Sequence, residues 1–292
     1  MKKGLALCMA AVLAMGCLLT GCGSSDTGAK STTESAAAST EAVGTEAAGT
    51  ETAGNGKTFT VGFDASFPPY GYVENGEYVG FDIDLAKEVA KRNGWNIKLQ
   101  AIDWNSKDFE LNSGTISCIW NGFTMNGRED KYTWTRAYVD NSQVVVVKAD
   151  SGINELSDLA GKTVAVQDDS SALAVLTNTE DNDEMLALAA TFNKLDKVGD
   201  YDTAFMNLAS GAVDAIAMDI GVAQFKVKAG GDKYKILDKQ LASEQYGVGF
   251  RKGSDAAAAL NEFFRQQWES GALQALAEQY GVQAALIEQK EF

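Results

Sequence analysis

The chain has 292 residues, of which 45% are hydrophobic, so it is long enough for two globular domains with substantial buried cores. Its formal net charge of −15 and the lack of a dense lysine and arginine cluster argue against nucleic-acid binding. Histidine is absent, which removes the commonest general base near neutral pH and the commonest metal ligand. Enzymatic functions are therefore less favoured, and our interpretation includes no catalytic residue, no metal site and no cofactor.

The first 22 residues predict a secretion leader. Three residues, Met1-Lys2-Lys3, supply positive charge, and the apolar run over 4–20 is too short to span a membrane comfortably. The leader ends in the tetrad Leu19-Thr20-Gly21-Cys22. This tetrad resembles the bacterial lipobox, which implies lipidation of Cys22 and cleavage before it. Diacylation supplies the two acyl chains that stable membrane anchoring needs.

Residues 23–56 predict a disordered tether. The segment consists of serine, threonine, alanine, glycine and scattered glutamate, with almost no large apolar side chain to offset the entropy of ordering. A flexible chain of this length has a root-mean-square reach of roughly 30 Å, which would hold a folded domain off a membrane while leaving it mobile.

The remaining chain alternates strand and helix patterns, which is typical of sheets flanked by helices. We expect strands near 58–63, 96–101, 116–120, 143–148, 163–167, 191–195, 213–218 and 235–238. We expect helices near 81–92, 106–113, 170–178, 183–190, 200–210 and 220–229, and one long helix over 256–279 with an apolar side formed by Ala257, Leu260, Phe264 and Trp268. The lone cysteine of this region, Cys118, is predicted to be a small buried hydrophobe on a strand.

The first strand ends at Asp64, where an open α/β sheet presents side chains to a ligand. The two prolines that follow force extended geometry on the residues before them and hold Phe67 and Tyr70 out from a stiff turn. Beyond that turn, Asp82 and Asp84 occupy the first turn of a helix, where carboxylates favour the positive end of the helix dipole. We therefore interpret these two aspartates as structural.

This helix carries a family resemblance. The run Gly80-Phe81-Asp82-Ile83-Asp84-Leu85, followed by Glu88-Val89-Ala90, is similar to the signature of the family 3 extracellular solute-binding proteins, which supply polar amino acids to ABC importers. The similarity extends in order from about Lys57 to the C-terminus. It implies an α/β, two-lobed, periplasmic-binding-protein-like (type II) fold, in which each lobe is a mixed sheet flanked by helices. Lobe 1 would comprise 57–146 and 246–292, lobe 2 would comprise 147–245, and two hinge strands near 143–148 and 246–251 would join them.

The resemblance also implies a ligand site in the first lobe. The segment over 121–129 resembles the family's glycine-x-threonine loop with its downstream arginine, here one residue shorter than usual. The implied ligand-binding residues are Arg128, Thr124 and the backbone at Asn121 and Gly122. A planar guanidinium matches both oxygens of an amino acid's carboxylate and keeps its charge. From spacing alone, a surface salt bridge is an equal alternative for Arg128.

In the second lobe, a strand leads into a helix whose free N–H groups can take a carboxylate. By resemblance, Ser170 and Ser171 complete the carboxylate site and Gln167 lines the pocket. Simple N-capping by Ser170 is the structural alternative. Asp169 stands where the family commonly has glycine, and it would repel a ligand carboxylate unless it turns away. Asp219 matches the family's ammonium-binding position, with capping of the helix from residue 220 as its alternative.

Aromatic residues would sandwich the ligand's side chain. The resemblance implies Phe67 and Trp104 in this role, while Trp120 is as well explained by a place in the core. Asp64 would reach the ligand's side-chain tip, which favours an amide or a cation there. Glutamine, another polar amino acid, a basic amino acid and the larger cystine all remain open.

The implied function is the substrate-binding component of an ABC importer. We expect a monomer, lipid-anchored through Cys22 to the extracellular face of the cell membrane, that delivers a free amino acid to the permease. One alternative is an enzyme on the same fold, such as a prephenate-type or cyclohexadienyl dehydratase, with Asp64, Asp219 or Glu129 as the acid or base. A second alternative is an extracellular amino-acid sensor, which would use the same cleft chemistry with a different membrane partner.

Overall fold

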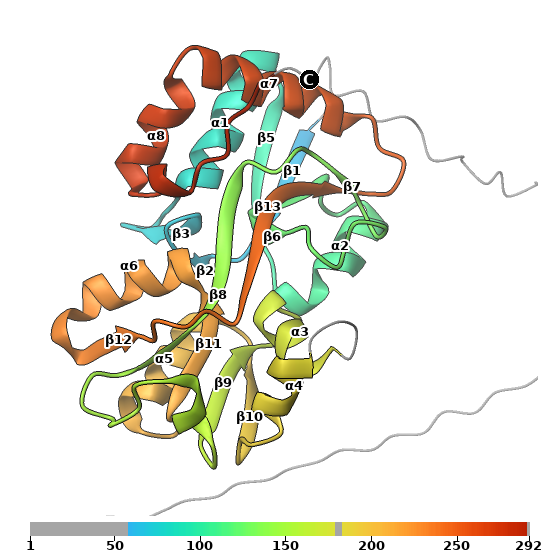
Figure 1. The fold of residues 1–292 in the computed structure, drawn as a ribbon. Helices are drawn as coiled ribbons and strands as arrows, with labels where there is room; N and C mark the ends of the chain where they lie inside the picture. The colour runs from blue at the N-terminus through green and yellow to red at the C-terminus, as the bar shows by residue number, and fades with distance from the viewer. Residues whose placement is uncertain (1–57, 179–182, 291–292) are drawn as a thin grey trace, which may run out of the picture. The chain divides into compact units, whose positions relative to one another are not determined.

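The computed structural model describes residues 58–178 and 183–290, so the predicted leader, lipidation site and tether lie outside the described residues. Two groups of parallel strands organise this part of the chain (Figure 1). In the first group, β1 (Thr58–Phe63) pairs with β5 (Asn96–Ala101) and with β6 (Cys118–Thr124). We call this group and its helices the first half.

The second group has the same arrangement. Its central strand β9 (Thr163–Gln167) pairs in parallel with β10 (Lys194–Val198) and with β11 (Ala215–Asp219). We call this group and its helices the second half. In both halves the parallel strands end toward the junction with the other half, so residues that follow strand ends, such as Asp64 and Asp219, come from opposite sides of one boundary.

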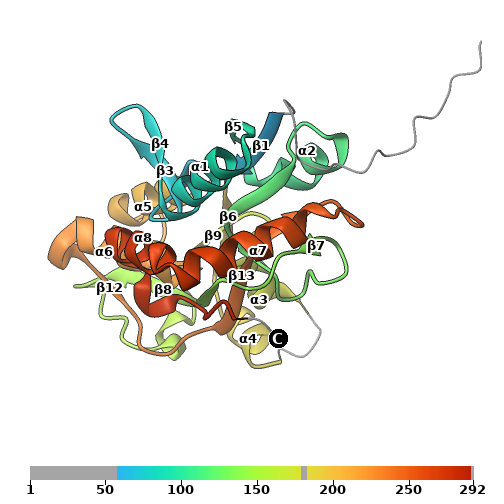
Figure 2. The ribbon, with the colours of Figure 1, turned by 90° about the horizontal axis from the view of Figure 1, so that it is seen from above.

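Helices flank the strands of both halves. Those of the first half are α1 (Phe81–Asn93), α2 (Lys107–Ser113), α7 (Ala256–Glu269) and α8 (Ala272–Tyr280). Those of the second half are α3 (Ser171–Thr177), α4 (Asp183–Ala189), α5 (Tyr201–Ser210) and α6 (Ile220–Gly230). Figure 2 shows α1, α7 and α8 together over the first half, and α8 contacts both of the others. Short 3-10 helices occupy Trp104–Ser106, Leu156–Leu159, Gly231–Lys233 and Gln283–Ala285.

Two long antiparallel strands join the halves. They are β8 (Val139–Lys148) and β13 (Ala242–Phe250), and they pair with each other between Val139↔Tyr246 and Gln143↔Ala242. Beyond this segment, β8 continues along β11 while β13 continues along β6. The two crossing strands implied by the resemblance are therefore present, and each begins four residues before its predicted start, at 139 instead of 143 and at 242 instead of 246. The lobe boundaries at 146/147 and 245/246 stay predictions.

Three short strands form a separate sheet that the sequence patterns did not predict. These strands are β2 (Ser66–Phe67), β3 (Gly71–Glu74) and β4 (Glu77–Val79), paired in antiparallel order. Two further short strands extend the main sheet, since β7 (Thr133–Trp134) pairs with β13 and β12 (Tyr234–Ile236) pairs with β8. Strands of two to four residues are too short to show an alternating pattern, which explains why β2, β3, β4 and β7 were missed.

The periodicity predicted most of the longer elements. In α1, Phe81, Leu85 and Val89 are buried as their helical spacing predicts, and Gly94 ends the helix with a φ of 64°. Cys118 is fully buried on β6, which confirms its predicted place in the core. Among the described residues, no helix combines the length and the apolar character that a membrane crossing requires.

Several boundaries differ from the prediction. The single helix expected over 256–279 is wrong, because Gly271 adopts a φ of 76° and separates α7 from α8. Three strands are shifted toward the C-terminus: β6 covers 118–124, β10 covers 194–198 and β11 covers 215–219. In each case the pairing partner fixes the ends, as where Lys194 pairs with Thr163 at the start of β9.

Candidate functional site

A pair of buried carboxylates lies where the two halves meet. Asp219 ends β11 and is 4% exposed, and Glu244 lies on β13 and is 5% exposed. On β8, the Asn141 amide nitrogen donates to Asp219 Oδ1 (2.9 Å) and to Glu244 Oε1 (2.7 Å), and the Gln143 amide nitrogen donates to the same two oxygens at 2.8 Å each. The two β8 amides therefore bridge Asp219 and Glu244.

Hydroxyl groups from both halves complete the hydrogen bonds of this pair. Tyr246 donates to Asp219 Oδ1 at 2.7 Å, and Tyr201 on α5 donates to Asp219 Oδ2 at 3.2 Å. Glu244 accepts from the hydroxyl of Thr124 on β6 at 2.8 Å and from the hydroxyl of Ser171 on α3. The predicted site residues Thr124, Ser171 and Asp219 are thus brought together around Glu244. The capping alternative for Asp219 is wrong, because α6 has no side-chain cap bond from it.

Asp64 forms a second contact between the halves. Its Oδ1 accepts from the Ser66 N–H at 2.8 Å, and its Oδ2 accepts from the Gln167 amide nitrogen on β9 at 2.7 Å. The Asn121 side-chain oxygen accepts from the Asp64 N–H at 3.0 Å. The structure therefore groups these three predicted residues, and the Asn121 contact involves its side chain. The N–H of Gly122 donates to Asp82 at 2.6 Å, so this N–H already has a partner.

Arg128 bridges the halves through backbone oxygens. Its Nη1 donates to the Thr124 carbonyl at 3.2 Å, and its Nη2 donates to the Asp169 carbonyl in the second half at 3.3 Å. The guanidinium carbon lies 5.3 Å from the centroid of the Phe123 ring. Among the described residues Arg128 forms no ion pair, so the surface salt-bridge alternative is not observed. No carboxylate of the described residues therefore compensates its charge at the junction.

The acidic pair before α3 is neutralised by lysines. Asp168 lies 3.1 Å from Lys197, and Asp169 pairs with Lys107 of α2, whose side chain is only 1% exposed. Asp169 has a φ of 55°, a left-handed conformation that glycine adopts most readily and aspartate tolerates. The predicted repulsion of a carboxylate is therefore reduced. Ser170 caps α3 by accepting from the Leu173 N–H, which confirms its capping role.

The aromatic candidates occupy three different environments. Phe67 lies between Tyr70 and Tyr201, with ring centroids 6.0 and 5.9 Å away, so it faces the second half. Trp104 packs edge-on against Phe123 at 5.5 Å and is 8% exposed. Trp120 is fully buried and packs edge-on against a phenylalanine of α7. Trp120 therefore belongs to the core.

Burial perturbs the carboxylates near the junction. It raises the pKa of Asp219 from an ordinary 3.8 to about 7, with the charge of Glu244 acting in the same direction. It also raises the pKa of Asp82 to about 7, although the bonds from the Gly122 N–H and the Tyr138 hydroxyl act to lower it. Burial raises the pKa of Asp64 as well. The folded chain therefore holds more protons than the unfolded chain between about pH 4 and pH 7.

We expect the stability of the ligand-free protein to fall as the pH rises from about 4 to about 7. A carboxyl whose pKa is raised on folding stabilises the fold below its unfolded pKa, and that contribution is lost as the pH passes the folded pKa. Asp82→Asn keeps the shape of the protonated acid, so this variant should lose less stability between about pH 4 and about pH 7. Melting temperatures at about pH 5 and about pH 7.5 measure it, with the exposed Asp150→Asn as the control. A higher melting temperature at the upper pH in both variants would contradict the assignment.

Sequence reasoning missed several polar residues that hold the site. These are Glu244, Asn141, Gln143, Tyr201, Tyr246 and Lys107. The crossing strands carried a signal, because side chains on a strand alternate between its two faces. Glu244 is two residues from the buried Tyr246 and so lies on the same face, and Gln143 lies on the same face as the buried Val145. A polar residue at an inward position between apolar ones indicates a built polar site.

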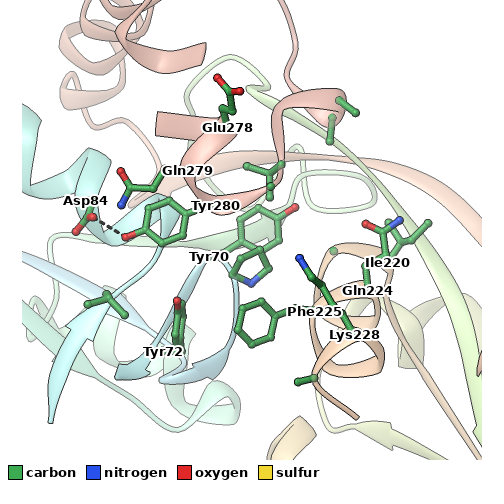
Figure 3. Close-up of a pocket in the computed structure, with 18 of the residues that line it drawn as sticks. Tyr70, Tyr72, Asp84, Ile220, Gln224, Phe225, Lys228, Glu278, Gln279 and Tyr280 are labelled. Carbon is green, nitrogen blue, oxygen red and sulfur yellow. Dashed lines mark hydrogen bonds between the residues drawn. The ribbon is translucent and has the colours of Figure 1, made fainter. Parts of the chain in front are cut away.

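A separate groove of about 1200 Å³ lies on the α6 side of the junction, between α6, α8 and β3 (Figure 3). The rings of Tyr72 and Phe225 approach each other across it, with centroids 5.5 Å apart. Tyr70 lines this groove and also contacts the rings of Phe67 and Tyr246. None of the predicted ligand-binding residues lines this groove, so the charged donors and acceptors define a site elsewhere.

Comparison with known proteins identifies the class. Residues 59–283 match the model of the bacterial extracellular solute-binding proteins, family 3. The chain belongs to this family, and the resemblance stated from the sequence is confirmed. The expected type II fold is confirmed as well, because the chain aligns with a TM-score of 0.71 to the crystal structure of an ABC uptake transporter substrate-binding protein from Streptococcus pneumoniae with bound histidine. That alignment has 30% identity and covers 78% of this chain and 94% of that one.

Curated relatives extend the comparison. The arginine-binding extracellular protein ArtP of Bacillus subtilis is 28% identical over 227 residues, covering 77% of this chain and 86% of the relative. The L-cystine-binding protein TcyJ of Escherichia coli K12 is 28% identical over 228 residues, covering 76% of this chain and 82% of the relative. These two relatives are equally similar in identity, so their names alone do not choose between arginine and cystine.

Proposed function

We propose that this chain is the substrate-binding component of an ABC importer for polar amino acids. Its family, its arginine- and cystine-binding relatives and its histidine-bound structural neighbour support this role. The observation that carries the proposal is that Arg128, which forms no ion pair among the described residues, and the buried carboxylate of Asp219 belong to one hydrogen-bonded network that joins both halves. The network runs from Arg128 through Thr124 and Glu244 to the amides that bond Asp219.

In this proposal, the two charged ends of a free amino acid have separate partners. The carboxylate is held by the Arg128 guanidinium and by the N-terminal end of α3, where Ser170 and Ser171 lie. The ammonium is held by Asp219, a buried carboxylate that forms no ion pair with a lysine or arginine of the described residues. Thr124 lies between the two ends because its hydroxyl and carbonyl contact both parts of the network.

The side chain of the ligand would extend toward Asp64 and Gln167. Their direct hydrogen bond shows that a carboxylate and an amide face each other across the junction. An amide or cationic tip can replace this bond on both sides, which favours polar and basic amino acids. Phe67 and Trp104 would flank the apolar part of the side chain. Glutamine, basic amino acids and cystine all satisfy this chemistry.

Closure of the two halves around the ligand would produce the form that the permease recognises. The crossing strands are the only pairing that continues from one half's sheet into the other's among the described residues, so they are the natural hinge. Contacts such as Lys107–Asp169 and Gln167–Asp64 join the halves in the described arrangement. A zwitterion that engages both halves would shift the population toward this arrangement.

We further propose that the chain is anchored to the extracellular face of the membrane by lipid on Cys22. The leader, the tetrad that ends in Cys22 and the polar composition of the following tether support this. Metabolic labelling with a fatty-acid analogue should tag the protein, and Cys22→Ser should remove the label and release the protein from membranes. Labelling that persists in Cys22→Ser would contradict the anchor.

A thermal-shift panel of the common amino acids plus cystine tests the proposed function. A ligand that binds only the folded chain at 100 times its Kd stabilises it by about 2.7 kcal/mol, which corresponds to roughly 5–10 °C in Tm at this size. We expect such a shift from at least one polar amino acid and recovery of that compound chemically unaltered. A panel without any shift would reject amino-acid binding. Conversion of the recovered compound would favour the dehydratase alternative.

A further inference from the structure

Among the residues that the structure describes, the Asp219–Glu244 pair has no positive partner. Both carboxylates are at least nine-tenths buried, and within residues 58–178 and 183–290 no lysine or arginine forms an ion pair with either. Their shared donors, the amides of Asn141 and Gln143, are neutral. Two adjacent buried carboxylates repel each other strongly because little water screens them, so the pair is stable only with a proton or another positive charge.

A second, independent observation points to a ligand at the same place. The side-chain oxygens of Asn141 and Gln143 are buried and accept no hydrogen bond from the described residues. Asn141 is 4% exposed and Gln143 is fully buried. Buried acceptors without donors are rare in folded proteins, and a bound group or an ordered water can supply the missing donors. An ammonium group carries three N–H donors and a positive charge, so it supplies what both the carboxylates and the amide oxygens lack.

We propose that Glu244 is a second ligand-binding carboxylate, which holds the ligand's ammonium group together with Asp219. The inference deepens the proposed function and rests on it. The site would then have an ammonium pocket formed by two carboxylates, with the amides of Asn141 and Gln143 on β8 lining one side of it. Because the pocket lies on β8, β11 and β13 at once, the ammonium would contact both hinge strands and the second half together.

This pocket accounts for selectivity toward free amino acids. A ligand without an ammonium group would leave two buried carboxylates facing each other without a cation, whereas a free α-amino acid neutralises them. Other groups facing the pair are the hydroxyls of Tyr201 and Tyr246 on Asp219 and those of Thr124 and Ser171 on Glu244. Hydroxyls donate hydrogen bonds but carry no charge, so they do not substitute for the cation.

The proposal is tested by the discrimination between an amino acid and its des-amino analogue. The probes are L-glutamine, L-arginine, L-histidine and L-cystine, each beside the same molecule without α-ammonium groups (both removed in the case of cystine). Binding to the full chain is measured by calorimetry. In the unmodified protein the amino acid should bind at least about 100-fold more tightly than its analogue. Glu244→Gln keeps the shape of the side chain and removes its charge. This variant should reduce the ratio of affinities by at least about tenfold, mainly by weakening the binding of the amino acid.

Two further variants control the experiment. Glu88→Gln, on the exposed face of α1, should keep the ratio of the unmodified protein. Glu244→Asp retains the charge on a shorter side chain and should give an intermediate ratio, while thermal melts verify that each variant is folded. An unchanged ratio in Glu244→Gln, or tighter amino-acid binding, would overturn the inference and leave the proposed function standing. If the unmodified protein binds none of the four amino acids, the proposed function and the inference both fail.

Discussion

Replacing Arg128 by alanine is expected to weaken amino-acid binding by at least about thirtyfold, or about 2 kcal/mol. The guanidinium is held by two carbonyl oxygens and has no carboxylate partner among the described residues, so its charge is available to a ligand carboxylate. Truncation would leave that carboxylate desolvated and without its bidentate donor, which costs more than the loss of a solvent-exposed pair.

Isothermal calorimetry with the amino acid that gives the largest thermal shift measures this effect. Arg128→Lys keeps the charge but loses the planar fork, so we expect an intermediate affinity. Arg92→Ala is the matched control, because Arg92 is exposed on α1 and lies over the ring of Phe263 on α7. Equal affinities in Arg128→Ala and in the unmodified protein would show that Arg128 takes no part in binding.

Replacing Trp120 by alanine is expected to destabilise the fold by about 3–5 kcal/mol. The indole is fully buried on β6 and packs edge-on against Phe264 of α7, with ring centroids 5.8 Å apart. Phe264 also stacks on Tyr138, which precedes β8, so removal of the indole would open a cavity between the first half's sheet and α7. The loss combines hydrophobic transfer with the residual cavity.

Urea denaturation followed by circular dichroism measures the loss in free energy of unfolding. Trp268 is partly exposed and lies on α7, the helix that carries Phe264. Trp268→Ala serves as a control and should cost clearly less. Trp120→Phe retains most of the buried ring and should keep both the fold and the affinity for the amino acid. A Trp120→Phe variant that is stable but has lost binding would show that Trp120 contacts the ligand's side chain.

Hydrophobic periodicity predicted the main strands and helices because these elements bury one regular face. The pattern at Phe81, Leu85 and Val89 is of this kind, and all three side chains are buried. The small sheet over 66–79 could not be predicted in this way, since its strands are two to four residues long. The break at Gly271 was missed because an isolated glycine is compatible with a helix unless its φ is positive.

The site was predicted in part. Strand ends indicated Asp64 and Asp219, since a parallel sheet presents such residues at one edge, and the structure places both at the junction. Glu244 and the amides of Asn141 and Gln143 were not predicted, because two antiparallel strands bring them together and a single sequence does not reveal that register. The Lys107–Asp169 pair was missed for the same reason: its members are 62 positions apart in sequence.

The course of the chain through the crossing strands makes the second half an insertion. Both the first described strand, β1, and the last helices, α7 and α8, belong to the first half, and the chain leaves along β8 and returns along β13. A graft of this insertion from a relative would therefore need only two splice points, and the Gln143↔Ala242 pairing sets them side by side. Such a chimaera would combine one parent's Asp64 and Arg128 with the other parent's Gln167 and Asp219, which separates the contributions of the two parents to ligand choice.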